Sequence, residues 1–407
     1  MRKIVLLSLF CSFALANQNS GLNLLNEDKK ELRELEKKYI ESSYENSKNS
    51  YIGTIDATIG LSRNHSFSDE KNANKNNIHQ KSASIGFTQS LFESGGISFT
   101  IKYAKDKLKY DLLSWENQNA TILQNIYDTL LEIKKVKLQL EQSKFKLENQ
   151  DIELVIKKLE YEAGKGDIIE LNNAVMSKNN QVKEHLSLEN SLKELEFELS
   201  KYTNLKYDEI EILEFANISK DDFLTSNLDI LQEDSKVEML NTSYKKSKTE
   251  YLPKLSLSTR ASYSLSGEKF NSVWSDTNKD DSSASATLTL SMPLYDYNKS
   301  SKLQMAKIDY LKQKSQVNDL KNEKAYDYEQ ILTKIDTYEK YIKTLNDNIK
   351  LYEDLILANK VSSQAGVTSK YDLDILENTK KINEYDVQIN DVNIKLQYSK
   401  LYFKIKG

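Results

Sequence analysis

The sequence predicts a mostly α-helical protein built from two copies of one plan, each a β-hairpin followed by a long antiparallel helical hairpin. Three observations support this prediction. Glycine and proline are scarce, with 11 and 2 residues in a chain of 407, which favours long uninterrupted helices. Four segments alternate apolar and hydroxyl-bearing residues with the period of a β-strand. Short motifs recur in the same order at an offset of 200 to 203 positions, which indicates an internal repeat.

The first residues of the chain, 1–16, are expected to be a secretory signal peptide. Arg2 and Lys3 precede an apolar run over residues 4–13, and this run is too short to cross a bilayer as a helix. Small residues at the end of the segment place the cleavage site after Ala16. We therefore expect a protein of the cell envelope.

The single cysteine and the net charge narrow the class of protein further. Cys11 lies inside the expected signal peptide, and acylation of this residue is disfavoured because Phe10 stands where a lipobox requires a small residue. The mature chain would then have no disulfide and no thiol chemistry. Removal of Arg2 and Lys3 changes the net charge from -4 to -6, and this mild acidity argues against nucleic acid as a partner.

Four strands are expected, over residues 51–61, 82–91, 255–265 and 283–294. In the last of these, the even positions Ala284 to Leu294 are apolar and the odd positions Ser283 to Ser291 are serine or threonine. One apolar and one hydroxyl-rich face is typical of membrane-barrel strands, with lipid outside and water inside. A soluble β-sandwich gives the same alternation, so the strand pattern alone leaves both possibilities open.

Long helices are expected after each strand pair. Residues 97–161 lack glycine and proline, and such a helix would be about 95 Å long. Its counterpart in the second copy carries a heptad seam, which predicts coiled-coil packing: Ile331, Ile335, Tyr338, Ile342, Leu345, Ile349, Tyr352 and Ile356. Glycine-containing turns lead to returning helices over 168–202 and 371–404, and a further helix is expected over 20–46.

These elements predict an order of eight segments along the chain. They are a signal peptide (1–16), an N-terminal helix (17–50), a first membrane β-hairpin (51–95), a first helical hairpin (96–203), an inter-repeat link (204–225), a helix leading into the second repeat (226–252), a second membrane β-hairpin (253–297) and a second helical hairpin (298–407).

The number of strands requires more than one copy of the chain. Four strands cannot close into a channel, since about eight is the smallest number that closes, and open sheet edges are not tolerated in lipid. Three copies would give a twelve-stranded β-barrel continued by a ring of twelve helices, and cyclic symmetry would close both rings. A homotrimer in contact with membrane lipid is therefore expected.

Four motifs are similar to those of the TolC-type outer-membrane efflux protein family. The strand-start and strand-to-helix motifs are "YLPKLSLS" from Tyr251 and "LTLSMPLYDYNKSSKLQMAK" from Leu288. The helix-turn motifs are "YEAGKGDIIELNNA" from Tyr161 and "QAGVTSKYDLDILE" from Gln364. The resemblance covers essentially the whole mature chain, and it is the duplication of the motifs in a fixed order that makes it specific.

The resemblance implies a trimeric outer-membrane channel that serves as the exit duct of a tripartite efflux pump or a type I secretion system. The channel would open at its periplasmic helical tip, where it would meet a periplasmic adaptor protein and, through it, an inner-membrane pump or ABC exporter. The competing hypothesis is a periplasmic coiled-coil adaptor or a structural envelope protein. The nature of the substrate is not indicated by the sequence.

The resemblance also suggests functional residues at the two helix turns. Acids after the turn glycines, Glu170 and Asp372 with the adjacent Asp374, are expected near the closed end of the pore. The family pattern places a second acid where this chain has Ile375, so the geometry of a second acidic ring stays open. Docking of the adaptor is expected at the turns themselves, which comprise Gly164, Lys165, Gly166, Gly366, Val367 and Thr368.

Each of these residues also has a purely structural interpretation. The glycines would cap helices in a left-handed conformation, and Asp372 would favour the start of a helix through the macrodipole. An enzyme is not expected, because no catalytic set or phosphate loop is visible and the three histidines have no metal-ligand spacing. No cofactor is implied.

Overall fold

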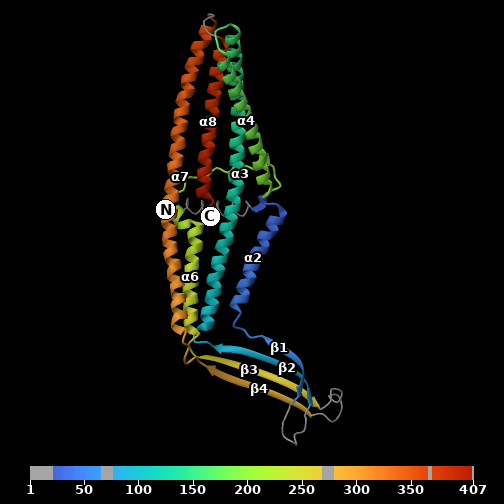
Figure 1. Cartoon of the computed structure of the whole chain (residues 1–407). Helices are drawn as coiled ribbons and strands as arrows, with labels where there is room; N and C mark the ends of the chain where they lie inside the picture. The colour runs from blue at the N-terminus through green and yellow to red at the C-terminus, as the bar shows by residue number, and fades with distance from the viewer. Residues whose placement is uncertain (1–21, 66–76, 268–278, 365–368, 406–407) are drawn as a thin grey trace. The chain divides into compact units, whose positions relative to one another are not determined.

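The computed structural model describes residues 22–65, 77–267, 279–364 and 369–405. Within them it contains long helices and one four-stranded sheet (Figure 1), so the predicted combination of helical hairpins and β-hairpins is confirmed. The chain forms two compact units. The helical unit comprises Met1–Glu36, Leu113–Gln232 and Val317–Gly407, and the sheet unit comprises Lys37–Leu112 and Glu233–Gln316. The expected signal peptide lies outside the described residues.

The elements follow the predicted order, with some differences at their ends. A short 3₁₀ turn, η1, precedes the first long helix, and a second, η2, lies between the repeats. In chain order the elements are η1 (Leu22–Leu24), α2 (Glu27–Lys48), β1 (Ile55–His65), β2 (Asn77–Phe92), α3 (Gly96–Glu162), α4 (Ile168–Ser200), η2 (Tyr207–Glu209), α5 (Lys220–Ser226), α6 (Leu228–Thr249), β3 (Lys254–Gly267), β4 (Lys279–Ser291), α7 (Lys299–Gln364) and α8 (Lys370–Tyr402).

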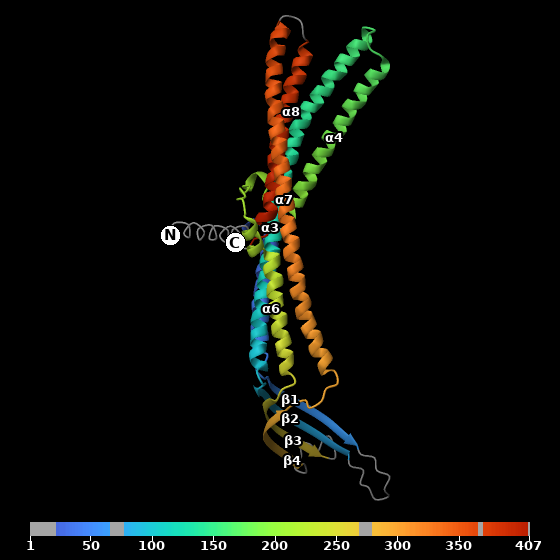
Figure 2. The ribbon, with the colours of Figure 1, turned by 90° about the vertical axis from the view of Figure 1, so that its left-hand side faces the viewer.

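The helical unit is built on two antiparallel helix pairs, α3 with α4 and α7 with α8 (Figure 2). Its core centres on the middle of α3, where apolar residues recur at helical spacing. Ile126, Leu130 and Ile133 are fully buried and pack in one cluster with Leu25 and Phe403. Each such side chain contributes about 1.5–3 kcal/mol through burial, so this cluster fixes α3 against the two ends of the chain.

The heptad seam predicted on α7 is its least exposed stripe. Ile331 and Ile335 are buried, and the six remaining seam residues up to Ile356 are half-buried. Ion pairs join α7 to α8 beside this seam, Lys360 with Glu377 at 2.9 Å and Glu353 with Lys380 at 2.8 Å. The predicted seam is thus the stripe that α7 buries, and coiled-coil packing itself stays a prediction.

The segment between the repeats packs into the core of the helical unit, whereas the sequence suggested only a link. Ile210 belongs to the cluster around α3, and Phe223 packs with Ile218, Tyr328 and Leu401. The reason is visible in the sequence, because apolar residues are spread through this polar stretch without helical or strand periodicity. Such a segment can bury its apolar side chains only by lying across other elements.

The sheet is antiparallel throughout, in the order β1-β2-β3-β4. Its register places the apolar positions of all four strands on one face. One such row across the sheet consists of Ala57, Ile85, Ala261 and Ala284. The opposite face carries mainly serine and threonine, as in the row of Thr58, Ser84, Ser262 and Ser283. The alternation predicted for single strands therefore gives two chemically distinct sheet faces.

The strands reach further into the polar segments than the sequence pattern indicated. Residues 63–65 and 77–80 were expected in a loop, yet they belong to β1 and β2. Backbone ladders continue there because pairing depends on main-chain groups and not on apolar side chains. At the other end of β2 the register shifts between Ser90 and Phe92, so that Phe92 and not Leu91 lies opposite Leu255.

Candidate functional site

The first helix turn has the geometry that its glycines predict. Gly164 has a φ of +70°, a left-handed conformation that a residue with a Cβ adopts only with strain. The amides of Lys165 and Gly166 donate to the carbonyl of Glu160 at 2.8 and 3.0 Å, which satisfies the free end of α3. Asp167 then begins α4 by accepting a hydrogen bond from the amide of Glu170. The turn is therefore closed by local backbone hydrogen bonds together with the side-chain cap of Asp167.

Glu170 forms an ion pair that the sequence analysis did not find. The amine of Lys157 on α3 lies 3.2 Å from the Glu170 carboxylate and 3.0 Å from that of Glu160. The hydrogen bond with Glu160, and then that with Glu170, raise the pKa of Lys157. The sequence does contain a signal for this ion pair, because Lys157 precedes Gly164 by almost as many residues as Glu170 follows it. A turn at Gly164 brings such positions together across an antiparallel helix pair.

The second helix turn is described from Ser369 onward; Gly366, Val367 and Thr368 lie outside the described residues. Ser369 and Asp372 form a capping box at the start of α8, in which the Asp372 carboxylate accepts a hydrogen bond from the Ser369 amide at 3.3 Å. Asp372 remains exposed, and Asp374 is half-buried. Two residues apart on a helix, the two acids point about 200° away from each other.

The two hairpins of the helical unit are joined by a polar contact below the turns. Asn378 of α8 donates to Asn149 of α3 at 3.0 Å, and Gln142 donates to the carbonyl of Ile382 at 3.0 Å. Phe145 and Tyr385 pack beside them with ring centroids 5.9 Å apart. Asn378 and Gln142 are buried, so separation of the hairpins at this level would expose or orphan buried polar groups.

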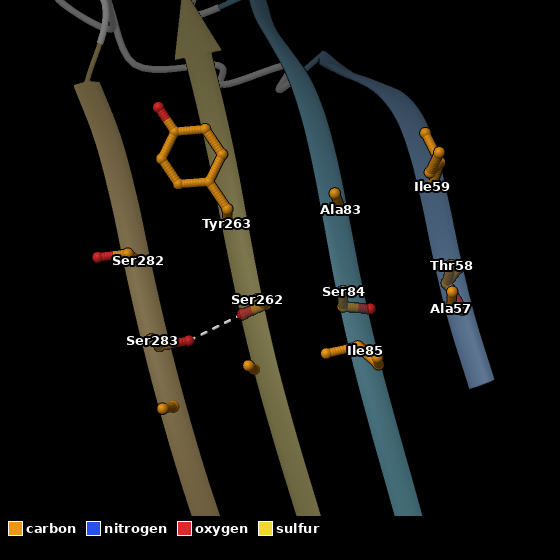
Figure 3. Close-up of a pocket in the computed structure, with 12 residues that line it drawn as sticks. Ala57, Thr58, Ile59, Ala83, Ser84, Ile85, Ser262, Tyr263, Ser282 and Ser283 are labelled. Carbon is orange, nitrogen blue, oxygen red and sulfur yellow. Dashed lines mark hydrogen bonds between the residues drawn. The ribbon is translucent and has the colours of Figure 1, made fainter. Parts of the chain in front are cut away.

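The sheet has two open faces and two open edges in the single chain. On the apolar face Ile59 is 87% exposed and Leu290 is 70% exposed. A hollow of about 740 Å³ is lined by all four strands, including Ala83, Ile85 and Tyr263 (Figure 3). On the hydroxyl face, side-chain hydrogen bonds cross the strands, Ser262 with Ser283 at 2.8 Å and Thr88 with Ser258 at 3.0 Å. A large apolar face exposed beside a self-satisfied polar face marks a surface that needs an apolar environment.

The described residues also bear on metal binding and on membrane-spanning helices. No group of three or more histidine, cysteine, aspartate and glutamate side chains is placed to hold a metal ion there. Within the same residues, the helices are too polar or too short for any of them to cross a membrane.

The fold is that of known outer-membrane channels. The outer membrane protein VceC from Vibrio cholerae is similar with a TM-score of 0.72 and 12% identity, over 96% of this chain and 97% of that one. The CmeC outer membrane channel of Campylobacter jejuni gives 0.69 and 14%, over 95% and 84% of the two chains. The open state of the Neisseria gonorrhoeae MtrE channel gives 0.65 and 12%, over 97% and 89%. At such identities the likeness establishes the fold.

The second repeat also matches a family in sequence. Residues 221–398 match the profile of the outer membrane efflux protein family, and this range includes the second β-hairpin and most of the second helical hairpin. No curated protein sequence is significantly similar to the chain. The resemblance predicted from the strand and turn motifs is confirmed: the chain has the fold of known outer-membrane channels over nearly its whole length, and residues 221–398 match the outer membrane efflux protein family.

Proposed function

We propose that three copies of this chain form an outer-membrane channel, which is the exit duct of a tripartite efflux pump or a type I secretion system. The observation that carries this proposal is the sheet, which has an exposed apolar face and two unpaired edges, β1 and β4. In lipid such edges must be paired, and the strands available for pairing are those of other copies. Two copies would close a barrel filled by its own side chains, whereas three leave a lumen.

The helical hairpins are consistent with the same number of copies, three. Two hairpins per chain supply four helices, so three chains form the twelve-helix periplasmic α-barrel below the twelve-stranded β-barrel. A periplasmic adaptor docks at the turns Gly164 to Gly166 and Gly366 to Thr368, and an inner-membrane pump or ABC exporter acts through it. The coiled-coil adaptor or structural fibre is not favoured, because the fold pairs each helical hairpin with membrane-type strands.

The closed end of the channel lies at the helix turns, and Asp372 lines it. Its carboxylate stays exposed while it caps α8, so threefold symmetry can bring three such groups toward the axis. Glu170 contributes less to the pore charge because Lys157 is bound to it. Asp374 points elsewhere on α8 and is the natural control.

Single-channel conductance in planar bilayers tests this arrangement. A trivalent cation added on the side of the helix turns should block the wild-type channel, most strongly at low ionic strength. Asp372→Asn removes three carboxylates at once and should weaken the block by about tenfold or more, since charge-assisted contacts are lost. Asp374→Asn should leave it unchanged. If only Asp374→Asn abolishes the block, the assignment of pore-facing acids is wrong.

A further inference from the structure

One row of residues across the centre of the hydroxyl face carries opposite charges. The register pairs Asp56 on β1 with Gly86 on β2, Gly86 with Arg260 on β3, and Arg260 with Ser285 on β4. The rows on either side of it consist of serine and threonine, for example Thr88, Ser258 and Thr287. A positive and a negative charge thus stand in the middle of this face, between rows of neutral residues, whereas its other charged positions, such as Lys254 and Asp281, lie toward the strand ends.

Arg260 is held in place, but no acid among the described residues forms an ion pair with it. Its side chain is exposed, and its Nη2 donates a hydrogen bond to the Ser84 hydroxyl of β2 at 2.9 Å. Asp56 accepts its own hydrogen bond from Thr54 at 3.2 Å, and it lies two strands away from Arg260, about 10 Å at the usual strand spacing. Gly86 stands between them and leaves that stretch of the face without a side chain. The Ser84 contact orients the guanidinium, and its other N–H groups are left for water or a solute.

We propose that Arg260 lines the lumen of the assembled barrel and binds anionic groups, carboxylate or phosphate, of solutes that pass through it. The inference rests on the proposed trimeric channel, in which the hydroxyl face points to water. Threefold symmetry places three guanidiniums at one height, and each offers the planar fork of donors that fits a carboxylate or phosphate. Asp56 from each chain acts in the opposite sense and repels the same solutes.

The chemistry of the face argues against a purely structural role for Arg260. The neighbouring rows are held together by hydroxyl contacts such as that between Ser262 and Ser283, so the sheet has no need of a charge at this position. A contact between an exposed arginine and a neutral hydroxyl adds little to stability in water. Serine or threonine at this position would continue the pattern of the face.

The experiment is block of single-channel current by inositol hexakisphosphate, added on the side of the β1–β2 and β3–β4 loops. In Arg260→Gln the half-blocking concentration should rise about tenfold, because charge-assisted hydrogen bonds are lost. In Asp56→Asn it should fall, because a repelling charge is removed. The matched control is Arg63→Gln, an arginine on the opposite face of β1, which should leave the block unchanged. Each variant is first checked for a trimer that conducts.

The outcomes separate this inference from the proposed function. A conducting Arg260→Gln trimer with wild-type block contradicts the inference and leaves the channel proposal standing. Loss of block in Arg63→Gln, with no change in Arg260→Gln, shows that the two faces of the sheet are assigned the wrong way round and also overturns it. A wild-type chain that forms neither a trimer nor a channel overturns the proposed function itself, and the inference with it.

Discussion

Asp229 connects four segments of the helical unit through one carboxylate. At the start of α6 it accepts a hydrogen bond from Asn117 of α3 at 2.8 Å, and Lys324 of α7 and Lys404 after α8 lie at 3.2 and 3.6 Å. Burial alone would raise the pKa of Asp229, but the Asn117 hydrogen bond and the two lysines outweigh it and lower the pKa below its ordinary value of 3.8. The ionised form is therefore bound more favourably in the folded chain than in the unfolded one.

The stability of the helical unit should depend on pH through this group. A lowered pKa contributes stability that is fully present above the ordinary value of 3.8 and is lost as the pH falls through the folded pKa. Asp229→Asn should then lower the free energy of unfolding by about 2 kcal/mol at pH 7, with a difference that shrinks in strong acid. Urea unfolding at pH 7 and in strong acid, followed by circular dichroism, measures this difference in the free energy of unfolding. An equal loss of stability at pH 7 and in strong acid would show that the charge of Asp229 does not cause it.

Asp128 of α3 provides a control, because its pKa is shifted in the opposite direction to that of Asp229. Burial, only partly offset by hydrogen bonds from Ser399 and Gln124, raises its pKa above the ordinary value. Its ionised form is thus disfavoured in the fold, and the resulting penalty is absent below the ordinary value of 3.8 and complete above the raised one. Asp128→Asn keeps the shape of the side chain and should stabilise the helical unit at pH 7 but not in acid.

At the scale of single elements, the strands show where sequence reasoning succeeds and where it stops. The alternation in residues 283–294 correctly predicts which positions of β4 share a face, because side chains alternate in every strand. The predicted end of β1 is too early and the predicted start of β2 too late, because polar residues such as Asn64 and Gln80 are typical of loops although their backbones are paired. Alternation marks the length of the apolar band, which is shorter than the ladder of main-chain hydrogen bonds.

Replacement of Leu288 on β4 tests the assignment of the sheet faces. Leu288→Arg would place a charge on the proposed lipid face, at a cost of about 2 kcal/mol or more in each chain. Thr287→Arg puts the same side chain on the neighbouring position, which faces the water-filled lumen and should tolerate it. Yield of heat-modifiable trimer in the outer-membrane fraction compares the two. Equal loss of trimer in both variants would show that the lipid and lumen faces of β4 are assigned wrongly.

At the scale of the whole molecule, the fold was predictable to the degree that it depends on local patterns. The scarcity of glycine, the heptad seam and the repeat offset are each visible in the sequence. Together they predict two β-hairpins and two helical hairpins. The left-handed Gly164 was predictable for the same reason. The row of Asp56, Gly86 and Arg260 was not, because it depends on the register of strands that are far apart in the sequence. Convergence of three Asp372 side chains is a property of the assembly and of no single chain.

The central claim is that three copies of the chain close one barrel, and the mass of the native assembly tests it most directly. The full-length protein is extracted from outer membranes in mild detergent and its mass is determined by native mass spectrometry before and after heating. The account predicts a species of three mature chains that heating converts to single chains. A monomer, an assembly of another number, or recovery of the protein in the periplasmic fraction would contradict it.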